Sequence, residues 1–113
     1  MDTVKKYQQI VISYLDGIAK RPYANTPAVE KQLIADKERN RFQLISFGWE
    51  NEDKLVNSTL IYVEIRGGKV WIQQNWTEME VASELAHLGI PKTDIVLGFV
   101  PAYSRADTEF AAA

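Results

Sequence analysis

Histidine is the side chain most often used for acid–base chemistry and metal binding near neutral pH, and the chain has a single one, His87. A transition-metal site needs several imidazole, thiolate or carboxylate ligands, and the sequence contains no cysteine. A serine nucleophile would need a histidine beside it, and no G-x-S-x-G motif is present. We therefore expect His87 to end a helix, where a protonated ring interacts favourably with the helix dipole.

The Asp and Glu side chains give little further indication of a catalytic or metal site. A metal-dependent nuclease needs converging Asp or Glu side chains with a lysine, and only Glu64 and Lys69 lie near one another in the sequence pattern. The pair Gly67-Gly68 follows a strand-like run but precedes no helix, so it is not a phosphate-binding loop. We predict a non-enzymatic protein with no cofactor, and keep a metal-dependent nuclease as the weakest alternative.

The remaining candidate is a surface. Tyr62, Glu64, Trp71 and Gln73 are predicted to share one face of a hairpin, and aromatic residues are enriched where proteins bind one another. Two other interpretations stay open. The first helix or the C-terminal tail could cover this face, or the two aromatic rings could stack on nucleic-acid bases, although Glu64 would repel phosphate.

The hairpin itself is the best-defined element. Gly-Gly between two β-branched runs favours a tight turn, because both glycines tolerate positive φ angles. With Gly67-Gly68 as the loop, Arg66 faces Lys69, and the pairing continues to Tyr62 opposite Gln73. The face opposite the candidate surface is then entirely aliphatic and must be core. Its members are Ile61, Val63, Ile65, Val70 and Ile72.

The other elements follow from hydrophobic spacing. Residues 2–19 have a helical apolar stripe. Strands are predicted at 28–35, 42–49, 58–66 and 69–75, and Thr77-Glu78-Met79-Glu80 matches a capping box that would begin a second helix. Residues 95–100 form a short apolar segment between prolines. The fold class is therefore α+β: an N-terminal helix, an antiparallel meander sheet of about four strands, then one or two C-terminal helices and a short tail.

The run from Phe42 to Trp49 is apolar on both of its faces. Such a strand is normally covered on both sides. One long and one short helix do not suffice for two covers, so we expect the protein to self-associate.

Composition limits the remaining classes. The 113 residues fit one domain, and the net charge of −2 does not suit a free-standing DNA-binding protein. No run approaches the ~20 apolar residues that span a bilayer. The absence of cysteine and of a secretory leader fits the reducing cytoplasm, where we expect the protein to be located.

Two blocks of the chain resemble the XisI family, which comprises small cyanobacterial controlling factors named for excision of a DNA element inside the fdxN gene. They are Gly68–Glu78 (GKVWIQQNWTE) and Gly89–Phe99 (GIPKTDIVLGF). The helix around Tyr7, the Phe42–Trp49 run and the segment Arg105–Ala113 are similar to the family as well. The resemblance covers nearly the whole chain, so residues 1–113 are identified as a single XisI-like domain.

The resemblance implies an accessory role in programmed excision of a DNA element by a site-specific recombinase. It also implies a protein partner of the XisH type, whose gene is typically adjacent. It supplies no catalytic residue. Direct contact with DNA within an excision complex is the alternative, and a homo-oligomer is compatible with either role.

Overall fold

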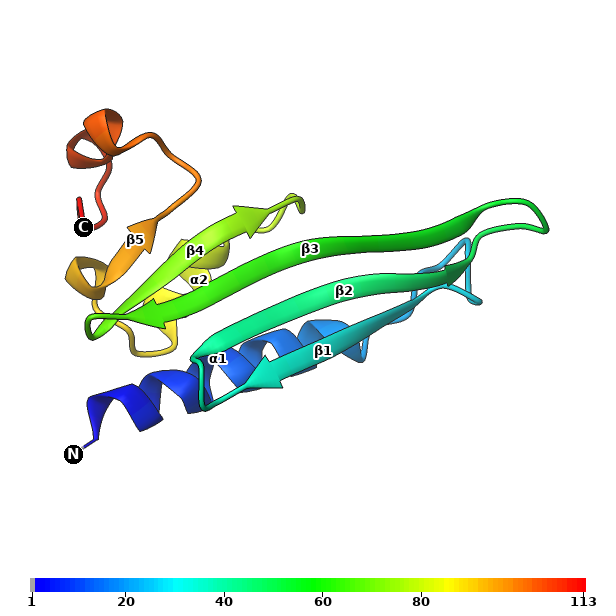
Figure 1. Cartoon of the computed structure of the whole chain (residues 1–113), viewed down its shortest axis with the longest axis horizontal. Helices are drawn as coiled ribbons and strands as arrows, with labels where there is room; N and C mark the ends of the chain where they lie inside the picture. The colour runs from blue at the N-terminus through cyan, green and yellow to red at the C-terminus, as the bar shows by residue number, and fades with distance from the viewer. Residues whose placement is uncertain (1) are drawn as a thin grey trace.

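The computed structural model describes residues 2–113 and shows one helical layer packed against one face of a sheet (Figure 1). This arrangement confirms the α+β class. The elements in chain order are α1 (Thr3–Ala19), β1 (Glu30–Asp36), β2 (Arg41–Trp49), β3 (Leu55–Arg66), β4 (Lys69–Asn75), α2 (Val81–His87), η1 (Lys92–Asp94), β5 (Ile95–Leu97) and η2 (Ala102–Asp107). None of the helices in this part of the chain is long and apolar enough to cross a membrane.

The predicted first helix is confirmed as α1. Asp2 caps it, because its carboxylate accepts a hydrogen bond from the Lys5 backbone N–H at 3.3 Å. The apolar stripe faces the sheet, and four of its side chains are fully buried. They are Tyr7, Val11, Leu15 and Ile18.

The sheet has five strands in the order β1-β2-β3-β4-β5, rather than the predicted antiparallel sheet of about four. The first four strands form the expected antiparallel meander. The fifth, Ile95–Leu97, pairs parallel to β4, so the sheet is mixed. The sequence shows these residues only as a short apolar segment, because their pairing with β4 depends on α2 returning the chain to the same edge.

The β3–β4 hairpin has the predicted register from Arg66 opposite Lys69 as far as Val63 opposite Ile72. The predicted pair of Tyr62 with Gln73 is wrong, because a β-bulge places Gln74 opposite Tyr62. An extra residue in one strand of a pair increases its local twist and bends it. The five predicted core residues of this hairpin are all buried. Their exposed fractions are 0% for Ile61, Val63 and Val70, 1% for Ile72 and 6% for Ile65.

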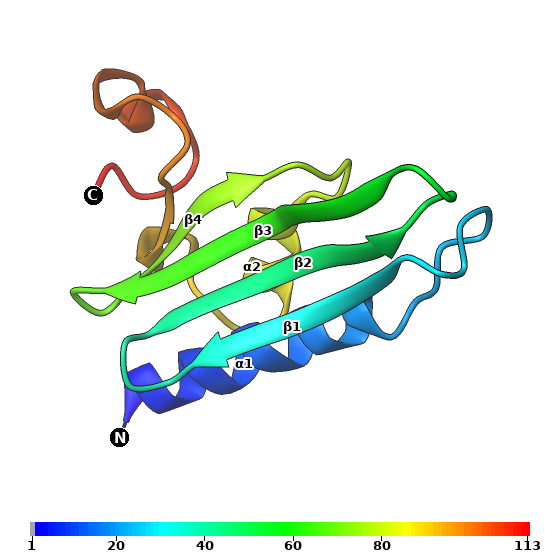
Figure 2. The ribbon, with the colours of Figure 1, turned by 45° about the vertical axis from the view of Figure 1, so that its right-hand side comes forward.

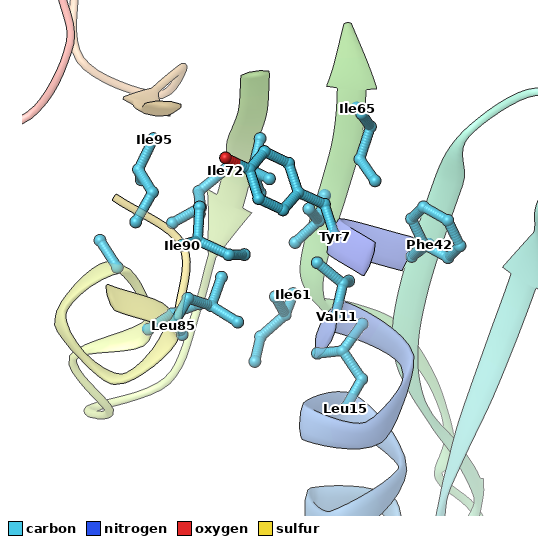
Figure 3. Packing of buried hydrophobic residues seen from close by; sticks show 14 of the residues in the cluster. Tyr7, Val11, Leu15, Phe42, Ile61, Ile65, Ile72, Leu85, Ile90 and Ile95 are labelled. Carbon is cyan, nitrogen blue, oxygen red and sulfur yellow. The ribbon is translucent and has the colours of Figure 1, made fainter. Parts of the chain in front are cut away.

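These aliphatic side chains meet α1 and α2 in a single core (Figure 3). Tyr7, Val11 and Leu15 reach it from α1. Leu85 reaches it from α2, and Ile90 from the turn that follows α2. Both helices therefore cover the same face of the sheet (Figure 2).

The second helix begins later than predicted, at Val81, and the capping box is wrong. The Thr77 hydroxyl donates to Asn75 Oδ1 at 2.5 Å and accepts from the Met79 N–H at 3.2 Å, so it stabilises the turn before the helix. The helix ends at His87, as predicted. Gly89 has φ +120°, and the N–H of the buried Ile90 bonds to the Leu85 carbonyl at 3.2 Å, which is the Schellman pattern.

Candidate partner-binding surface

The second face of the sheet is not covered by either helix. Side chains directly opposite one another in paired strands share a face, and so do alternate residues along each strand. The register therefore places Ile34, Gln43 and Tyr62 in one row across β1, β2 and β3, with Arg41, Glu64 and Trp71 in the next row. We call this face the open face.

Glu64 is the centre of a polar network on the open face. Its carboxylate accepts hydrogen bonds from the Tyr62 hydroxyl at 2.7 Å and from Gln73 Nε2 at 3.0 Å. Arg41 and Arg66 lie 3.4 Å and 3.8 Å from its two oxygens. The structure thus brings Tyr62, Glu64 and Gln73 into direct contact, with Trp71 on the strand position opposite Glu64.

The network fixes the charge of its members. The hydrogen bond from Tyr62 lowers the pKa of Glu64, and the bond from Gln73 and the two arginines act in the same direction against the effect of burial. Burial, followed by the bond to Glu64, raises the pKa of Tyr62. Glu64 is therefore an ionised hydrogen-bond acceptor with only 14% of its side chain exposed. Two arginines offset its charge, so the sequence-based expectation that it repels phosphate is weakened.

Trp71 is held by arginines. The guanidinium carbons of Arg66 and Arg105 lie 4.1 Å and 5.3 Å from the centre of its ring system, within cation–π range. Arg105 also donates to the carbonyls of Val100 at 2.9 Å and Gly98 at 3.3 Å, so the guanidinium that contacts Trp71 is held within the folded C-terminal segment. Of the two covers considered from the sequence, α1 lies on the other face. The tail reaches the Trp71 side of the open face.

Sequence reasoning missed the apolar end of the open face. The Phe42–Trp49 run was expected to be covered on both sides, but Phe47 is 41% exposed and Trp49 is 54% exposed. Leu55, opposite Trp49, is 45% exposed, and Ile34, opposite Gln43 nearer the Glu64 network, is 49% exposed. No alternation within that run distinguishes the two faces, because apolar side chains occur on both. The prediction of two covers is wrong for the single chain because α1 and α2 both pack on the same face of the sheet. Contacts between segments distant in sequence determine which face the helices cover.

The other candidates do not converge. His87 is exposed at the end of α2, where its Nδ1 lies 2.9 Å from the Ser83 carbonyl. Lys69 contacts the terminal Ala113 carbonyl rather than Glu64. No group of three or more His, Asp or Glu side chains that could hold a metal occurs within residues 2–113. A cavity of about 350 Å³ lies between the turn before α2 and the C-terminal segment, lined by Met79, Leu97 and Phe110 among others.

A helical layer on one face of a five-stranded sheet, with the second face open, defines a small two-layer α+β protein. The chain belongs to the XisI family: the family model described as XisI protein matches residues 1–112. This match confirms the resemblance seen in the Gly68–Glu78 and Gly89–Phe99 blocks. No curated protein matches the chain.

Two solved structures of XisI proteins are similar to this chain over nearly their whole length. The crystal structure of a XisI-like protein from Anabaena variabilis ATCC 29413 at 1.30 Å resolution is 37% identical, with a TM-score of 0.88. The match covers 97% of this chain and 99% of that one. The fdxN element excision controlling factor XisI from the same organism, solved at 2.19 Å, is 31% identical with a TM-score of 0.80. That match covers 99% of this chain and 100% of that one.

Proposed function

We propose that this protein is a non-enzymatic accessory factor that controls excision of a DNA element by binding a protein partner of the XisH type. The observation that carries the excision role is full-length membership of the XisI family, together with the match to the fdxN element excision controlling factor over 99% of the chain. The Glu64 network on the open face is the proposed contact surface.

Three features of the open face, which contains the Glu64 network, support partner binding. It combines aromatic rings with arginines, the residue types that dominate binding energy in protein interfaces. Its polar groups are held by mutual hydrogen bonds, so little side-chain freedom is lost on association. Its apolar end, with Phe47 and Trp49, is exposed in the single chain. Large exposed apolar patches on small domains commonly mark interaction sites.

The test is co-expression with a XisH-type protein, followed by affinity purification and titration calorimetry. We expect a stable complex that Arg66→Glu weakens by roughly a hundredfold, because Arg66 is exposed beside Glu64 and Trp71. Arg39→Glu is the matched control, since Arg39 is exposed in the β1–β2 turn and pairs with Asp36 there. Repeated failure to recover a complex, or equal weakening by both variants, would count against the proposal.

Direct binding to DNA is the second candidate. The observation that favours it is the gathering of Arg41, Arg66 and Arg105 around Glu64 and Trp71. The guanidinium contacts to Trp71 oppose it, because a stacked base would have to displace them. Gel-shift affinity that falls steeply with salt, and falls further in Arg66→Glu, would support this candidate. Cleavage of plasmid DNA with Mg²⁺ that is lost in Glu64→Ala would instead support the nuclease alternative.

A further inference from the structure

A small hollow lies beside the β3–β4 turn on the open face. Its volume is about 220 Å³, and it is lined by Arg66, Gly67, Lys69, Trp71 and Ala113. Pockets that bind a free small molecule usually measure at least roughly 300 Å³. The hollow therefore suits a single side chain that projects from another molecule better than it suits a separate ligand.

Two cations face each other at this hollow. The hairpin register places Arg66 directly opposite Lys69, and like charges at opposed strand positions destabilise a sheet. Arg66 approaches the Glu64 carboxylate only to 3.8 Å, which is beyond hydrogen-bond distance. Glu64 already accepts hydrogen bonds from Tyr62 and Gln73. The positive charge of the opposed pair is therefore only partly offset.

The surroundings of the hollow strengthen this excess of positive charge. Lys69 contacts the Ala113 carbonyl, which uses one of the three N–H donors of its ammonium group. Arg105 lies over the Trp71 ring and donates to two backbone carbonyls. Within residues 2–113, Glu64 is the one carboxylate that forms an ion pair with any cation around the hollow. A chain with a net charge of −2 thus carries a local positive patch here.

We propose that this hollow binds a carboxylate side chain of the protein partner, so that the segment of the partner that contacts the open face is acidic. The inference rests on the proposed function and adds the chemistry of the group that this surface recognises. A carboxylate in the hollow accepts charge-assisted hydrogen bonds from Arg66 and from the remaining donors of Lys69. Its negative charge also offsets the repulsion between these two opposed side chains.

The rest of the open face favours a protein over a nucleic acid. A nucleic acid requires positive charge along the path of its backbone. Here the row of paired residues that passes through Trp71 ends at Asp36 on β1. The open face then continues into the exposed rings of Phe47 and Trp49. A protein segment that presents a carboxylate together with apolar side chains matches both the hollow and these rings.

Indole N–H signals in a nitrogen–proton NMR spectrum test the site directly, because the chain has only three tryptophans. Titration of the isotope-labelled protein with a hexaglutamate peptide should shift the Trp71 signal and leave those of Trp49 and Trp76 unchanged. A hexaglutamine peptide should shift none of the three. The double variant Arg66→Gln with Lys69→Gln should weaken hexaglutamate binding by about tenfold, because it removes both donors at the hollow.

The matched control is the double variant Lys5→Gln with Lys6→Gln, which removes the same charge from α1 on the other face of the sheet (Figure 2). It should change hexaglutamate binding by less than about twofold, since charges that far apart are largely screened by salt. Circular dichroism should show that both double variants are folded. Equal weakening by the two overturns the proposal, and so does tighter binding of a thymidine hexanucleotide than of hexaglutamate. A Trp71 signal that shifts when the protein alone is diluted would assign a second copy to the hollow and also overturn it.

The complex with a XisH-type protein separates this inference from the proposed function. Excess hexaglutamate should dissociate that complex, as a competitor for the hollow. A complex that resists hexaglutamate and forms equally well with Arg66→Gln and Lys69→Gln together would keep the proposed function and remove the acidic contact. A Trp71 signal that responds to hexaglutamate when no XisH-type complex can be recovered would support the carboxylate site and count against the proposed partner.

Discussion

Tyr7 links the first helix to the segment before β5. Its ring is 3% exposed, and its hydroxyl contacts a carboxylate oxygen of Asp94. Burial, and then the bond to Asp94, raises the pKa of Tyr7 to about 12 from its ordinary value of 10.0. The folded state therefore holds the phenol neutral over a pH range in which the unfolded chain loses its proton.

The consequence is a pH dependence of stability with a defined sign. Because the folded pKa is above the unfolded value, the stabilisation by Tyr7 is fully present below pH 10 and is lost as the pH rises toward about 12. Tyr7→Phe should flatten the decline of the free energy of unfolding in this window, measured by urea denaturation at successive pH values. Burial also raises the pKa of Tyr14, so a residual slope remains.

The control for Tyr7→Phe is Tyr103→Phe, at a side chain that is 87% exposed. This variant should follow the wild-type curve. An unchanged alkaline slope in Tyr7→Phe would mean that the hydroxyl titrates alike in the folded and unfolded states.

At the scale of elements, the features that could be predicted from the sequence are those that depend on residues close together in the chain. The α1 stripe and the Gly67-Gly68 hairpin depend on spacing within one segment, and both were predicted correctly. The bulge opposite Tyr62 and the strand β5 depend on contacts between distant segments, such as the Gly98 N–H bonding to the Ile72 carbonyl at 2.8 Å. No local pattern contains that information.

The candidate surface likewise combines features set by local sequence with features set by long-range contacts. Hairpin alternation placed Tyr62, Glu64 and Trp71 on one face of the sheet. It could not show that Arg41 and Arg105 come from other elements to join them. Local alternation therefore predicts the face of a side chain, whereas its charge environment depends on the tertiary fold.

Gly48 provides a prediction for a single strand. It has φ +145°, and a Cβ there would lie 2.3 Å from the Ala28 carbonyl oxygen. Gly48→Ala should therefore lower the free energy of unfolding by about 2 to 5 kcal/mol, through backbone strain and overpacking of β2 against the segment before β1. Thermal or urea denaturation measures the loss.

Gly17→Ala is the matched comparison, because nothing lies within 4 Å of a Cβ at that exposed position in α1. It should stabilise the protein by about 0.5 to 1 kcal/mol, as expected for a glycine within a helix. Equal effects at the two positions would show that β2 does not approach Ala28 as closely as the structure indicates.

At the scale of the whole molecule, the sheet divides two tasks between its faces. One face carries Phe42, fully buried under the helices, and the other carries Phe47, which is 41% exposed, on the same strand. The first builds the core. The second adds little to the stability of the single chain and is free to contact another molecule.

The two phenylalanines test this division directly. Phe42→Ala should lower the free energy of unfolding by about 3 to 5 kcal/mol, because it leaves a cavity in the core. Phe47→Ser should change it by less than about 1 kcal/mol and should reduce binding of an apolar fluorescent dye to the folded protein. A large loss of stability in Phe47→Ser would mean that the open face is covered in solution, and that the cover contributes to folding as the two helices do on the other side.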